Sequence, residues 1–409
     1  MNKKYLLYGM GIANRAVYQF MLKRGIWVKV YTDGDSGDWE KVLDNVDIII
    51  KSPGIFPYTP FLKLAREKNK EIIGDLELFY RFKPLKNIIC VTGTNGKTTV
   101  CCLLHQILQT QYRVFLGGNI GIPLFSIIDC DEPDILIIEA SSYMLDNTVS
   151  FHPRVAILLN LFPNHLDYHE TWNNYCHAKK KILTNLTEED YFIYNGQDIV
   201  LNTWAKETIA KTLPFALETL DEELLSINAG LIGQHNKANI QVAKTIAKLF
   251  SVNDCDFSKV LKEFSLPQFR LEKIWDKNGL VIYNDSKATN PLASKAALEA
   301  MANSKEKVIW IAGGKKRGDD YSLLKDYLMN VQMVYLWGEN AEEFIPVLRE
   351  QKIDYDVNAD LEKILTDIIN NHSQAVILFS PGAQSFDRFA SFEERGEYFN
   401  KTVQKIFSL

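Results

Sequence analysis

Residues 91–99 of this chain read Val91-Thr-Gly-Thr-Asn-Gly-Lys-Thr-Thr99, between an apolar run at 88–91 and a helical pattern over 100–109. Glycines let backbone N–H groups close around a phosphate, and the helix N-terminus adds positive potential there. Lys97 can reach the β- and γ-phosphates of a nucleotide, and the Thr98 hydroxyl can ligate magnesium. Val91 stands where the general phosphate-loop pattern has its first glycine. The context still predicts an ATP site in preference to a plain glycine turn with a solvated lysine. The residues expected to bind the nucleotide here are Gly93, Thr94, Asn95, Gly96, Lys97, Thr98 and Thr99.

The same succession of a short apolar run, a glycine or polar residue and a helical stretch occurs along the whole chain, and it is typical of buried parallel strands in an α/β fold. Proline near residues 84 and 267 separates three groups of such runs, because proline stops helices and favours linkers. We therefore expect three domains. They are a Rossmann-like domain over 1–86, a central P-loop ATPase domain with a mostly parallel sheet over 87–266, and a C-terminal Rossmann-like domain over 267–409. The expected strands are 5–8, 28–31, 46–50, 88–91, 135–138, 155–159, 280–283, 308–311, 334–337 and 375–379.

The composition excludes several classes of protein. The 409 residues include 46 Lys and Arg against 51 Asp and Glu, a net charge of −5, so no overall charge draws the chain to nucleic acid or to an anionic membrane. The six cysteines form no Cys-x-x-Cys pair, which argues against a structural zinc site and a disulfide scaffold. No apolar run approaches the ~18 residues that a membrane span needs. The N-terminal stretch lacks the features of a secretory signal. We expect a cytoplasmic protein.

Two residues at the ends of expected strands could work beside the phosphate loop, since ligands of open α/β sheets bind at that edge. Glu139 closes the run 135–138 and would suit a magnesium ion, although it could also be a carboxylate at a helix N-terminus. His165 follows the next strand, but a loop histidine taken alone is more often structural than a ligand. Both therefore remain open as metal ligands at this point.

Further candidates have equally plain alternatives. Gly9 and Gly11 begin a dinucleotide fingerprint, but Asn14 replaces its third glycine, so a tight turn without a ligand is as good a reading. The cationic loop 315–317 suits a phosphate or a carboxylate, or is simple surface. The lysines at 179–181 alone would be a solvated helix face.

Taken together, these segments resemble the Mur ligase family, in the family's order and over essentially the whole chain. Residues 284–290 and 380–389 are similar to the branch of that family that adds D-glutamate, and the Asp-Asn-Pro-Arg motif of the diaminopimelate-adding branch is absent. The segments that carry the resemblance, besides the phosphate loop, are Gly118 to Gly121, Glu139 to Ser142, Asn164 to Asp167, Tyr175 with Ala178 and Lys179, Gly233 to Asn236, Asn284 to Asn290, and Ser380 to Phe389.

The resemblance implies an ATP-dependent amide ligase that adds D-glutamate to UDP-N-acetylmuramoyl-L-alanine in peptidoglycan precursor synthesis. The first domain would bind the UDP-sugar, the central domain ATP, and the C-terminal domain the amino acid. The carboxylate of the substrate would take the γ-phosphoryl group of ATP, and the amine of D-glutamate would attack the resulting acyl phosphate. We expect a monomer with these small-molecule partners, and neither a nucleic acid nor a membrane as a partner.

The resemblance also implies roles for individual residues. Lys97 and Thr98 would hold the phosphates and one Mg²⁺ ion, with Glu139 as a further ligand, and His165 would serve a second Mg²⁺. Lys179 resembles the lysine that this family carbamylates with carbon dioxide, which would let it support that second ion. The implied catalytic residues are Lys97, His165, Lys179 and Lys287. Those implied along the adenosine are Asn236, Arg270 and Asp285. Those implied to contact the substrates are Gly11, Ile12 and Asn119 for the UDP-sugar, and Thr289, Arg317, Ser385, Phe386 and Phe392, with Lys287, for D-glutamate.

This chain departs from the family pattern in places. Arg317 stands where some relatives have lysine, although both side chains bind carboxylates. Gly382 and Gln384 alter the usual run of small residues before Ser385. The residue that would meet the uridine is ambiguous among residues 32, 33 and 35.

Two other functions remain open on the sequence alone. One is another amide ligase with the same ATPase core, such as an L-alanine-adding Mur ligase or a folylpolyglutamate synthetase, which would differ over residues 284–290. The other is a nucleotide-switch ATPase, which would not need a third domain with its own carboxylate-binding groups.

Overall fold

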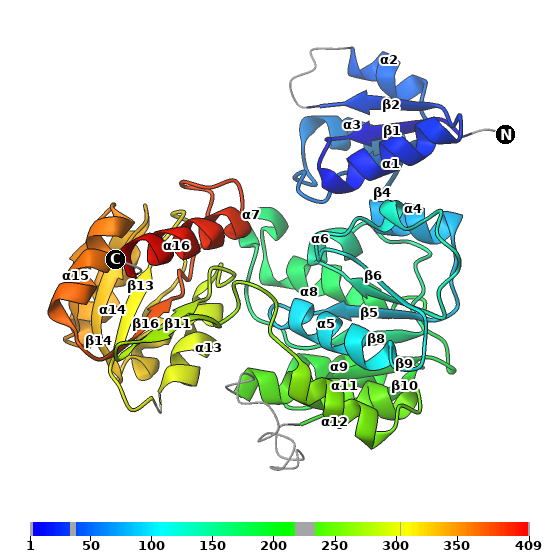
Figure 1. Cartoon of the computed structure of the whole chain (residues 1–409). Helices are drawn as coiled ribbons and strands as arrows, with labels where there is room; N and C mark the ends of the chain where they lie inside the picture. Colours follow the sequence, from blue (N-terminus) through cyan, green and yellow to red (C-terminus); the bar gives the residue numbers. More distant parts are fainter. Residues whose placement is uncertain (1–2, 33–37, 217–233, 303, 408–409) are drawn as a thin grey trace. The chain divides into compact units, whose positions relative to one another are not determined.

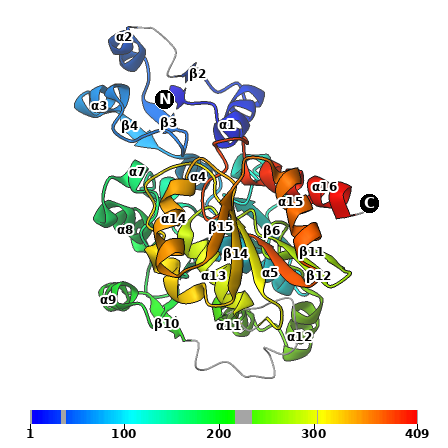
Figure 2. The ribbon, with the colours of Figure 1, turned by 90° about the vertical axis from the view of Figure 1, so that its left-hand side faces the viewer.

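The computed structural model describes residues 3–32, 38–216, 234–302 and 304–407. Its elements form two compact units (Figures 1 and 2). Unit 1 comprises Met1–Ile227 and Ala238–Glu263, and unit 2 comprises Asn228–Lys237 and Phe264–Leu409. Two sheets belong to unit 1 and one to unit 2, and we describe each by itself.

The N-terminal sheet of unit 1 has the strand order β2-β1-β3-β4, and all of its pairs are parallel. Successive side chains of a strand point to opposite faces. Leu6 and Tyr8 therefore pack against one helical layer, α2 and α3, while Leu7 packs on the side of α1 and α4. The elements are β1 (Tyr5–Tyr8), α1 (Ile12–Lys23), β2 (Val28–Tyr31), α2 (Trp39–Asp44), β3 (Ile48–Lys51), α3 (Pro60–Glu67), β4 (Glu71–Ile73) and α4 (Asp75–Phe82).

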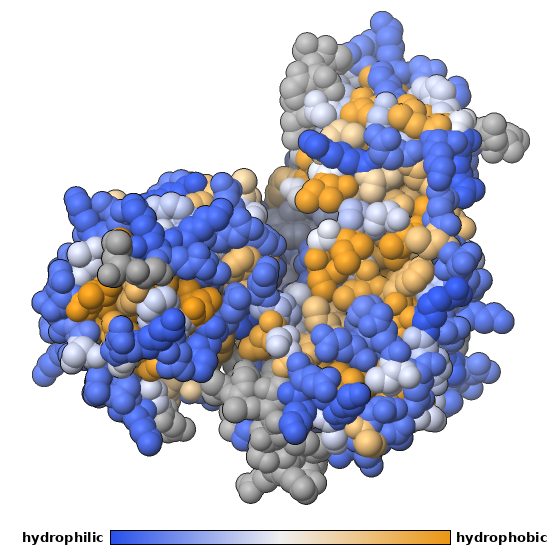
Figure 3. All heavy atoms as spheres, viewed as in Figure 1, coloured by the Kyte–Doolittle hydropathy of each residue, from blue (hydrophilic) through white to orange (hydrophobic). Residues whose placement is uncertain are grey.

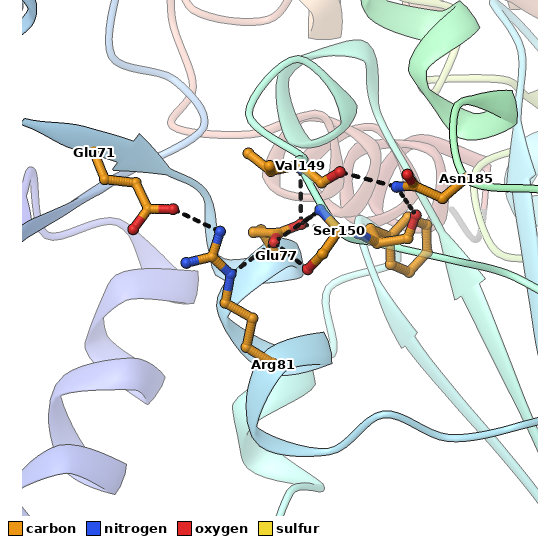
Figure 4. A network of polar contacts seen from close by, with 7 residues as sticks. Glu71, Glu77, Arg81, Val149, Ser150 and Asn185 are labelled. Carbon is orange, nitrogen blue, oxygen red and sulfur yellow. Dashed lines mark hydrogen bonds and ion pairs between the residues drawn. The ribbon is translucent and has the colours of Figure 1, made fainter.

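Helix α4 joins this sheet to the central one. Its residue Glu77 is fully buried and accepts hydrogen bonds from the backbone N–H groups of Val149, Ser150 and Phe151 (Figure 4). Arg81 of the same helix donates its Nε to the same carboxylate at 2.7 Å. One continuous hydrophobic cluster also contains residues of α1 and α4 together with residues of the central sheet. The two sheets of unit 1 therefore share a core.

The central sheet has the order β10-β9-β8-β5-β7-β6 and is also fully parallel. Its middle strand β5 is buried along its whole length, as expected for a parallel strand with helices on both sides. Helix α11 crosses the division between the units at residue 237. The elements are β5 (Ile88–Thr92), α5 (Lys97–Leu108), β6 (Val114–Gly118), η1 (Leu124–Ser126), β7 (Ile135–Glu139), α6 (Ser142–Leu145), β8 (Val155–Leu158), α7 (Leu166–His169), α8 (Trp172–Lys180), η2 (Lys181–Leu183), β9 (Tyr191–Asn195), α9 (Ile199–Glu207), β10 (Lys211–Phe215), α11 (Gln234–Leu249) and α12 (Asp254–Glu263).

The sheet of unit 2 has the order β11-β12-β16-β13-β14-β15, with β11 antiparallel at one edge and the other pairs parallel. Trp310 and its alternate neighbours in β13 face α13, η4 and α14, whereas Ile309 and Ile311 face α15 and α16. The elements are β11 (Glu272–Lys277), β12 (Leu280–Asn284), α13 (Pro291–Met301), β13 (Val308–Ala312), η4 (Ser322–Tyr327), β14 (Val331–Leu336), α14 (Ala341–Glu350), β15 (Asp354–Val357), α15 (Leu361–Asn371), β16 (Ala375–Phe379) and α16 (Phe392–Phe407).

The predicted α/β class with mostly parallel sheets is confirmed. All ten predicted strands occur, with ends that differ by three residues at most. The boundaries predicted near residues 86 and 266 stay predictions. On the face drawn in Figure 3, hydrophilic residues cover most of unit 2, and the larger hydrophobic areas lie on unit 1. Within the described ranges, no helix combines the length and the apolar character that crossing a membrane requires.

Candidate active site

The phosphate loop connects β5 to α5, and its shape depends on two glycines. Gly93 and Gly96 have φ angles of +150° and +86°, a region that favours glycine. Space is short as well, because a Cβ atom on Gly93 would lie 3.0 Å from the Cβ of Leu159. The loop therefore runs close to the end of β8, and the strand–loop–helix arrangement predicted from residues 91–99 is present.

Asn160, directly after β8, holds this loop from the side. Its Oδ1 accepts the backbone N–H groups of Thr94 and Asn95 at 3.0 and 2.9 Å, and its Nδ2 donates to the Asn95 carbonyl at 3.1 Å. The Thr94 hydroxyl lies 2.8 Å from the Tyr175 hydroxyl of α8. These bonds fix the loop on two sides. Asn160 follows the expected strand 155–159, at the sheet edge where functional residues are expected, but its hydrogen bonds to the phosphate loop were not predicted.

Two lysines converge on one carbonyl of the loop. Lys97 Nζ donates to the carbonyls of Gly93 and Thr94 at 2.9 and 2.8 Å. Lys179 Nζ, from α8, donates to the same Gly93 carbonyl at 2.8 Å and to the Thr92 hydroxyl at 3.2 Å. Lys179 is only 1% exposed, and this burial, together with the positive charge of Lys97, holds its pKa well below the usual range. Its amine is therefore neutral far more readily than that of an exposed lysine.

Glu139 ends β7 beside these lysines and is almost fully buried. Its Oε1 accepts the Asn119 Nδ2 at 2.8 Å, while no described residue donates a hydrogen bond to its Oε2. The backbone of Asn119 also donates to the Glu139 carbonyl at 2.8 Å. Gly118 makes this approach possible, since a Cβ atom there would lie 2.4 Å from the same carbonyl oxygen. Asn119 thus orients Glu139, and its predicted contact with the substrate stays a prediction.

Two oxygen donors near the loop could serve a magnesium ion. Among the described residues, no group of three or more His, Cys, Asp or Glu side chains is arranged so that it could hold a metal ion by itself. Magnesium is bound by few protein oxygens and keeps several waters and substrate phosphates as ligands. The buried Oε2 of Glu139 and the hydroxyl of Thr98, in the first turn of α5, fit that requirement.

His165 is the N-cap residue of α7 and has a φ of +56°. Its ring lies 4.9 Å from that of Tyr143, which belongs to α6 and so follows Glu139 closely in the chain. Tyr143 also stacks on His169. The Nε2 of His169 lies 2.9 Å from the Ser142 hydroxyl, and burial lowers the pKa of His169 to about 4. The structure thus brings His165 to the segment after β7. The role of His165 toward a metal stays a prediction.

In the N-terminal sheet the turn after β1 lies against the end of β3. Asn14 donates its Nδ2 to the carbonyls of Gly9 and Ile50 at 2.8 and 3.1 Å, so the residue in the third glycine position has a structural role. Gly11 precedes α1, and Ile12 is 71% exposed, while their contact with the UDP-sugar stays a prediction. Residues 33 and 35, two of the three candidates for the uridine, lie outside the described residues.

Lys51, at the end of β3, is a buried cation that the sequence analysis missed. Its Nζ donates to the Ile55 carbonyl at 2.9 Å and to the Tyr168 hydroxyl of α7 at 2.8 Å. Burial lowers its pKa to about 8. This contact ties the loop after β3 to helix α7, which His165 precedes.

In unit 2 most of the candidate residues lie on loops at the carboxyl ends of β12, β13 and β16, whereas Arg270 precedes β11 and Phe392 begins α16. Asp285 accepts the Ser380 hydroxyl at 2.8 Å and the Leu271 backbone N–H at 3.2 Å, and burial raises its pKa to about 7. Lys287 Nζ lies 3.6 Å from the centre of the Phe392 ring. Residues 269 and 271, on either side of Arg270, both have positive φ angles.

The remaining predicted contacts of D-glutamate belong to the same edge. Arg317 follows Gly314, whose N–H donates to Asn340 Oδ1 at 2.8 Å. Ser385 is buried, whereas Phe386 is 60% exposed. Thr289 lies in the loop that leads into α13. Asn236 is buried in the first turn of α11. The contacts of all these residues with nucleotide or amino acid stay predictions, as does a cleft common to the two units.

Comparison with known proteins gives a consistent result. Residues 91–220 match the Mur ligase middle domain, and residues 269–382 match the Mur ligase, glutamate ligase domain. The protein named UDP-N-acetylmuramoylalanine--D-glutamate ligase of Hydrogenobaculum sp. (strain Y04AAS1) is 35% identical over 421 residues, which cover 99% of each chain. The protein of the same name from Aquifex aeolicus (strain VF5) is 33% identical, again over 99% of each chain.

Solved structures agree at the level of the fold. The MurF ligase from Thermotoga maritima in complex with ADP has a TM-score of 0.64 and 19% identity, covering 90% of this chain and 91% of that one. The UDP-N-acetylmuramate-alanine ligase MurC from the same organism has a TM-score of 0.61 and 17% identity, covering 98% and 99%. The resemblance drawn from the motifs is therefore confirmed, and this chain belongs to the Mur ligase family.

Proposed function

We propose that this chain is an ATP-dependent ligase that joins D-glutamate to UDP-N-acetylmuramoyl-L-alanine through an acyl phosphate, in peptidoglycan precursor synthesis. The observation that carries the proposal is the convergence of Lys97 and Lys179 on the Gly93 carbonyl, in the same buried surroundings as Glu139. The names and coverage of the curated relatives support the choice of substrates. The proposal includes a monomer that works in the cytoplasm, where ATP and the UDP-linked precursor are available.

The first step joins two anions, so it needs positive charge at the point of reaction. A carboxylate oxygen of the UDP-linked substrate attacks the γ-phosphorus of ATP, the bond to the β,γ-bridging oxygen breaks, and ADP leaves. The ammonium of Lys97 is held over the loop by two carbonyls and can exchange them for phosphate oxygens. Asn160 keeps the loop in one conformation, so its positive potential needs little reorganisation when the phosphates bind.

Thr98 and Glu139 would hold one Mg²⁺ ion, and His165 with carbamylated Lys179 would hold a second. When bound, Mg²⁺ neutralises phosphate charge and polarises the γ-phosphoryl group. The buried Oε2 of Glu139 supports this assignment, because a buried carboxylate oxygen without a donor favours a cation.

Carbamylation of Lys179 requires its neutral amine. The amine nitrogen attacks the carbon of carbon dioxide, a C–N bond forms, and one proton is released, which leaves an anionic carbamate. The lowered pKa of Lys179 supports this step, since it makes the nucleophilic form accessible. The change would convert a buried amine into an oxygen ligand for metal.

In the second step the amine of D-glutamate attacks the acyl phosphate, an amide bond forms, and phosphate leaves. Lys287 and Arg317 would pair with the carboxylates of the amino acid, and Thr289 and Ser385 would donate hydrogen bonds to them. Phe386 and Phe392 would flank its carbon chain. Support comes from the place of these residues, since all but Phe392 lie on the loops after β12, β13 and β16, and Phe392 begins α16. Arg270 and Asp285, with Asn236, would lie along the adenosine.

Incubation with ATP, UDP-N-acetylmuramoyl-L-alanine and D-glutamate tests the proposal, with the product mass as readout and each of the other amino acids as a control. We expect a product whose mass has grown by one glutamate residue, and phosphate release that depends on both substrates. Release that another amino acid stimulates would indicate a different amide ligase. Release indifferent to both substrates would indicate a nucleotide switch.

A further inference from the structure

Arg395, in the second turn of α16, is the second-largest side chain among the fully buried residues described. Its Nε donates to the Ser286 hydroxyl at 3.1 Å, its Nη2 to the Ser286 carbonyl at 2.8 Å, and its Nη1 to the Ala383 carbonyl at 3.0 Å. Desolvating a cation is expensive unless its donors are well used. Burial lowers its pKa to about 10, so the guanidinium still carries its charge at neutral pH.

The three hydrogen bonds of Arg395 connect two loops, and a third loop packs against its guanidinium. Ser286 lies in the loop after β12 and Ala383 in the loop after β16. A Cβ atom on Gly314, in the loop after β13, would lie 3.0 Å from Nη1 of Arg395, so this loop passes directly against the guanidinium. One planar side chain therefore lies against the loops that follow β12, β13 and β16. Lysine, with a single ammonium, cannot donate in three fixed directions within one plane.

Each of these loops carries residues of the proposed D-glutamate site. Lys287 and Thr289 follow Ser286, Arg317 follows Gly314, and Ser385 and Phe386 follow Ala383. Arg395 itself is buried, and three of its five N–H groups donate to two of these loops, so it is placed to act on the amino acid through them.

The start of α16 contacts the same loops at two more points. The Phe392 carbonyl, one turn before Arg395, accepts the Ser286 hydroxyl at 2.8 Å. The Gly396 carbonyl accepts Nδ2 of Asn284 at 3.0 Å. A Cβ atom on Gly396 would lie 2.3 Å from the Phe269 ring, so the helix packs tightly against the segment that carries Arg270. Arg395 is thus the charged centre of a packed junction.

We propose that Arg395 is a positioning residue for the amino-acid acceptor, which sets the mutual spacing of the three loops that bind D-glutamate. The inference rests on the proposed function for the identity of the amino acid. In this proposal Arg395 fixes the geometry of the acceptor site, and the loop residues contact the amino acid directly.

Arg395→Lys tests the proposal, with Arg388→Lys as the matched control. Arg388 is a partly exposed arginine nearby that donates to the Ala359 carbonyl at 2.8 Å and to neither Ser286 nor Ala383. We expect Arg395→Lys to raise the KM for D-glutamate by about tenfold to a hundredfold. The KM for UDP-N-acetylmuramoyl-L-alanine should stay within about twofold of the native value, and the control should change neither.

Amide hydrogen exchange supplies a second readout that needs no activity. Arg395→Lys should speed exchange in residues 284–289, 313–317 and 381–387 and leave residues 93–97 of the phosphate loop unchanged. Equal rises in KM for both substrates, or exchange that rises in both units, would indicate a general structural role and overturn the proposal. Exchange in the three loops at the native rate would also overturn it, because Arg395 would then not order them. If the native chain makes no glutamyl product, the proposed function fails, and the exchange result still decides whether Arg395 orders the loops.

Discussion

Glu77→Gln probes how firmly helix α4 is fixed to the central sheet of unit 1. Glu77 Oε2 accepts three successive backbone N–H groups, from residues 149, 150 and 151, at 2.9 to 3.0 Å. Its Oε1 accepts the Ser150 hydroxyl at 2.6 Å and Arg81 Nε at 2.7 Å. Figure 4 shows these donors around the carboxylate. Glutamine keeps the shape but has hydrogens on one of the two positions that accept bonds here.

The size of the effect follows from which bonds survive. The amide oxygen can keep the three backbone N–H groups if the amide nitrogen takes the place of Oε1, where it then faces Arg81 Nε. Hydrogen bonds to charged groups are worth about 1.5–3 kcal/mol, so we expect the free energy of unfolding of unit 1 to fall by about 2 kcal/mol. Glu77→Ala would leave the N–H groups buried without an acceptor and should cost about 3–5 kcal/mol.

The assay is urea unfolding together with amide exchange of residues 149–151, with Glu71→Gln as control. Glu71 is the other carboxylate that Arg81 contacts, but its side chain is 36% exposed. Exposed ion pairs contribute about 0–1 kcal/mol, so the control should remain near the native stability. Local exchange at 149–151 should become faster in Glu77→Gln and stay unchanged in Glu71→Gln.

The pH dependence gives the same reasoning a second test. Burial raises the pKa of Glu77, but the hydrogen bonds from Ser150, Val149 and Arg81 outweigh it, so the folded-state pKa lies below the ordinary value. The stabilisation is therefore complete above the unfolded-state pKa of about 4.3 and is lost as pH falls through the lower folded-state pKa. The difference in free energy of unfolding between the native chain and Glu77→Gln should become smaller as pH falls through that range. The reasoning is refuted if Glu77→Gln is as stable as Glu71→Gln at pH 7, or if the gap widens in acid.

Three further changes have defined outcomes. Lys179→Ala should lower the rate of product formation by about a hundredfold and recover part of it with added short-chain carboxylic acids, and no recovery would remove the carbamate role. Burial raises the folded-state pKa of Asp285 to about 7, so between about pH 4 and 7 the folded state binds more protons than the unfolded state. The free energy of unfolding should therefore fall by up to about 4 kcal/mol as pH rises through this range. Asp285→Asn should abolish that fall in thermal unfolding, and a slope as steep as the native one would contradict the assignment. Asn160→Ala should weaken ADP binding about tenfold in calorimetry, because the loop loses its lateral hydrogen bonds, and native affinity would show that the loop holds its shape alone.

Sequence reasoning found the interior of each sheet and missed most of its edges. A parallel strand in the middle of a sheet is buried on both faces, so it must be a continuous apolar run, and those runs are visible in the sequence. Within the described residues, six strands were missed, and five of them, β4, β6, β10, β11 and β15, are edge strands. Edge strands can be polar: β15 reads Asp-Tyr-Asp-Val, and β11 reads Glu-Lys-Ile-Trp-Asp-Lys. Only β9 was missed inside a sheet.

The candidate site divides along a similar line, between local spacing and tertiary contact. The phosphate loop is local, so its glycines and Lys97 could be predicted from spacing alone. The contacts of Asn160 and Arg395 could not be predicted, because Asn160 bonds to Asn95, 65 residues away in the chain, and Arg395 bonds to Ser286, 109 residues away. Lys179 lies between these two cases, because its burial could have been predicted from spacing but its contacts could not. Three lysines in a row look like a solvated face, yet in α8 Lys179 falls four residues after Tyr175, on the stripe that also buries residues 176 and 178. Helical periodicity would have predicted that Lys179 is buried, unlike the two lysines that follow it. Because lysine is rarely fully buried, such a position indicates a functional role.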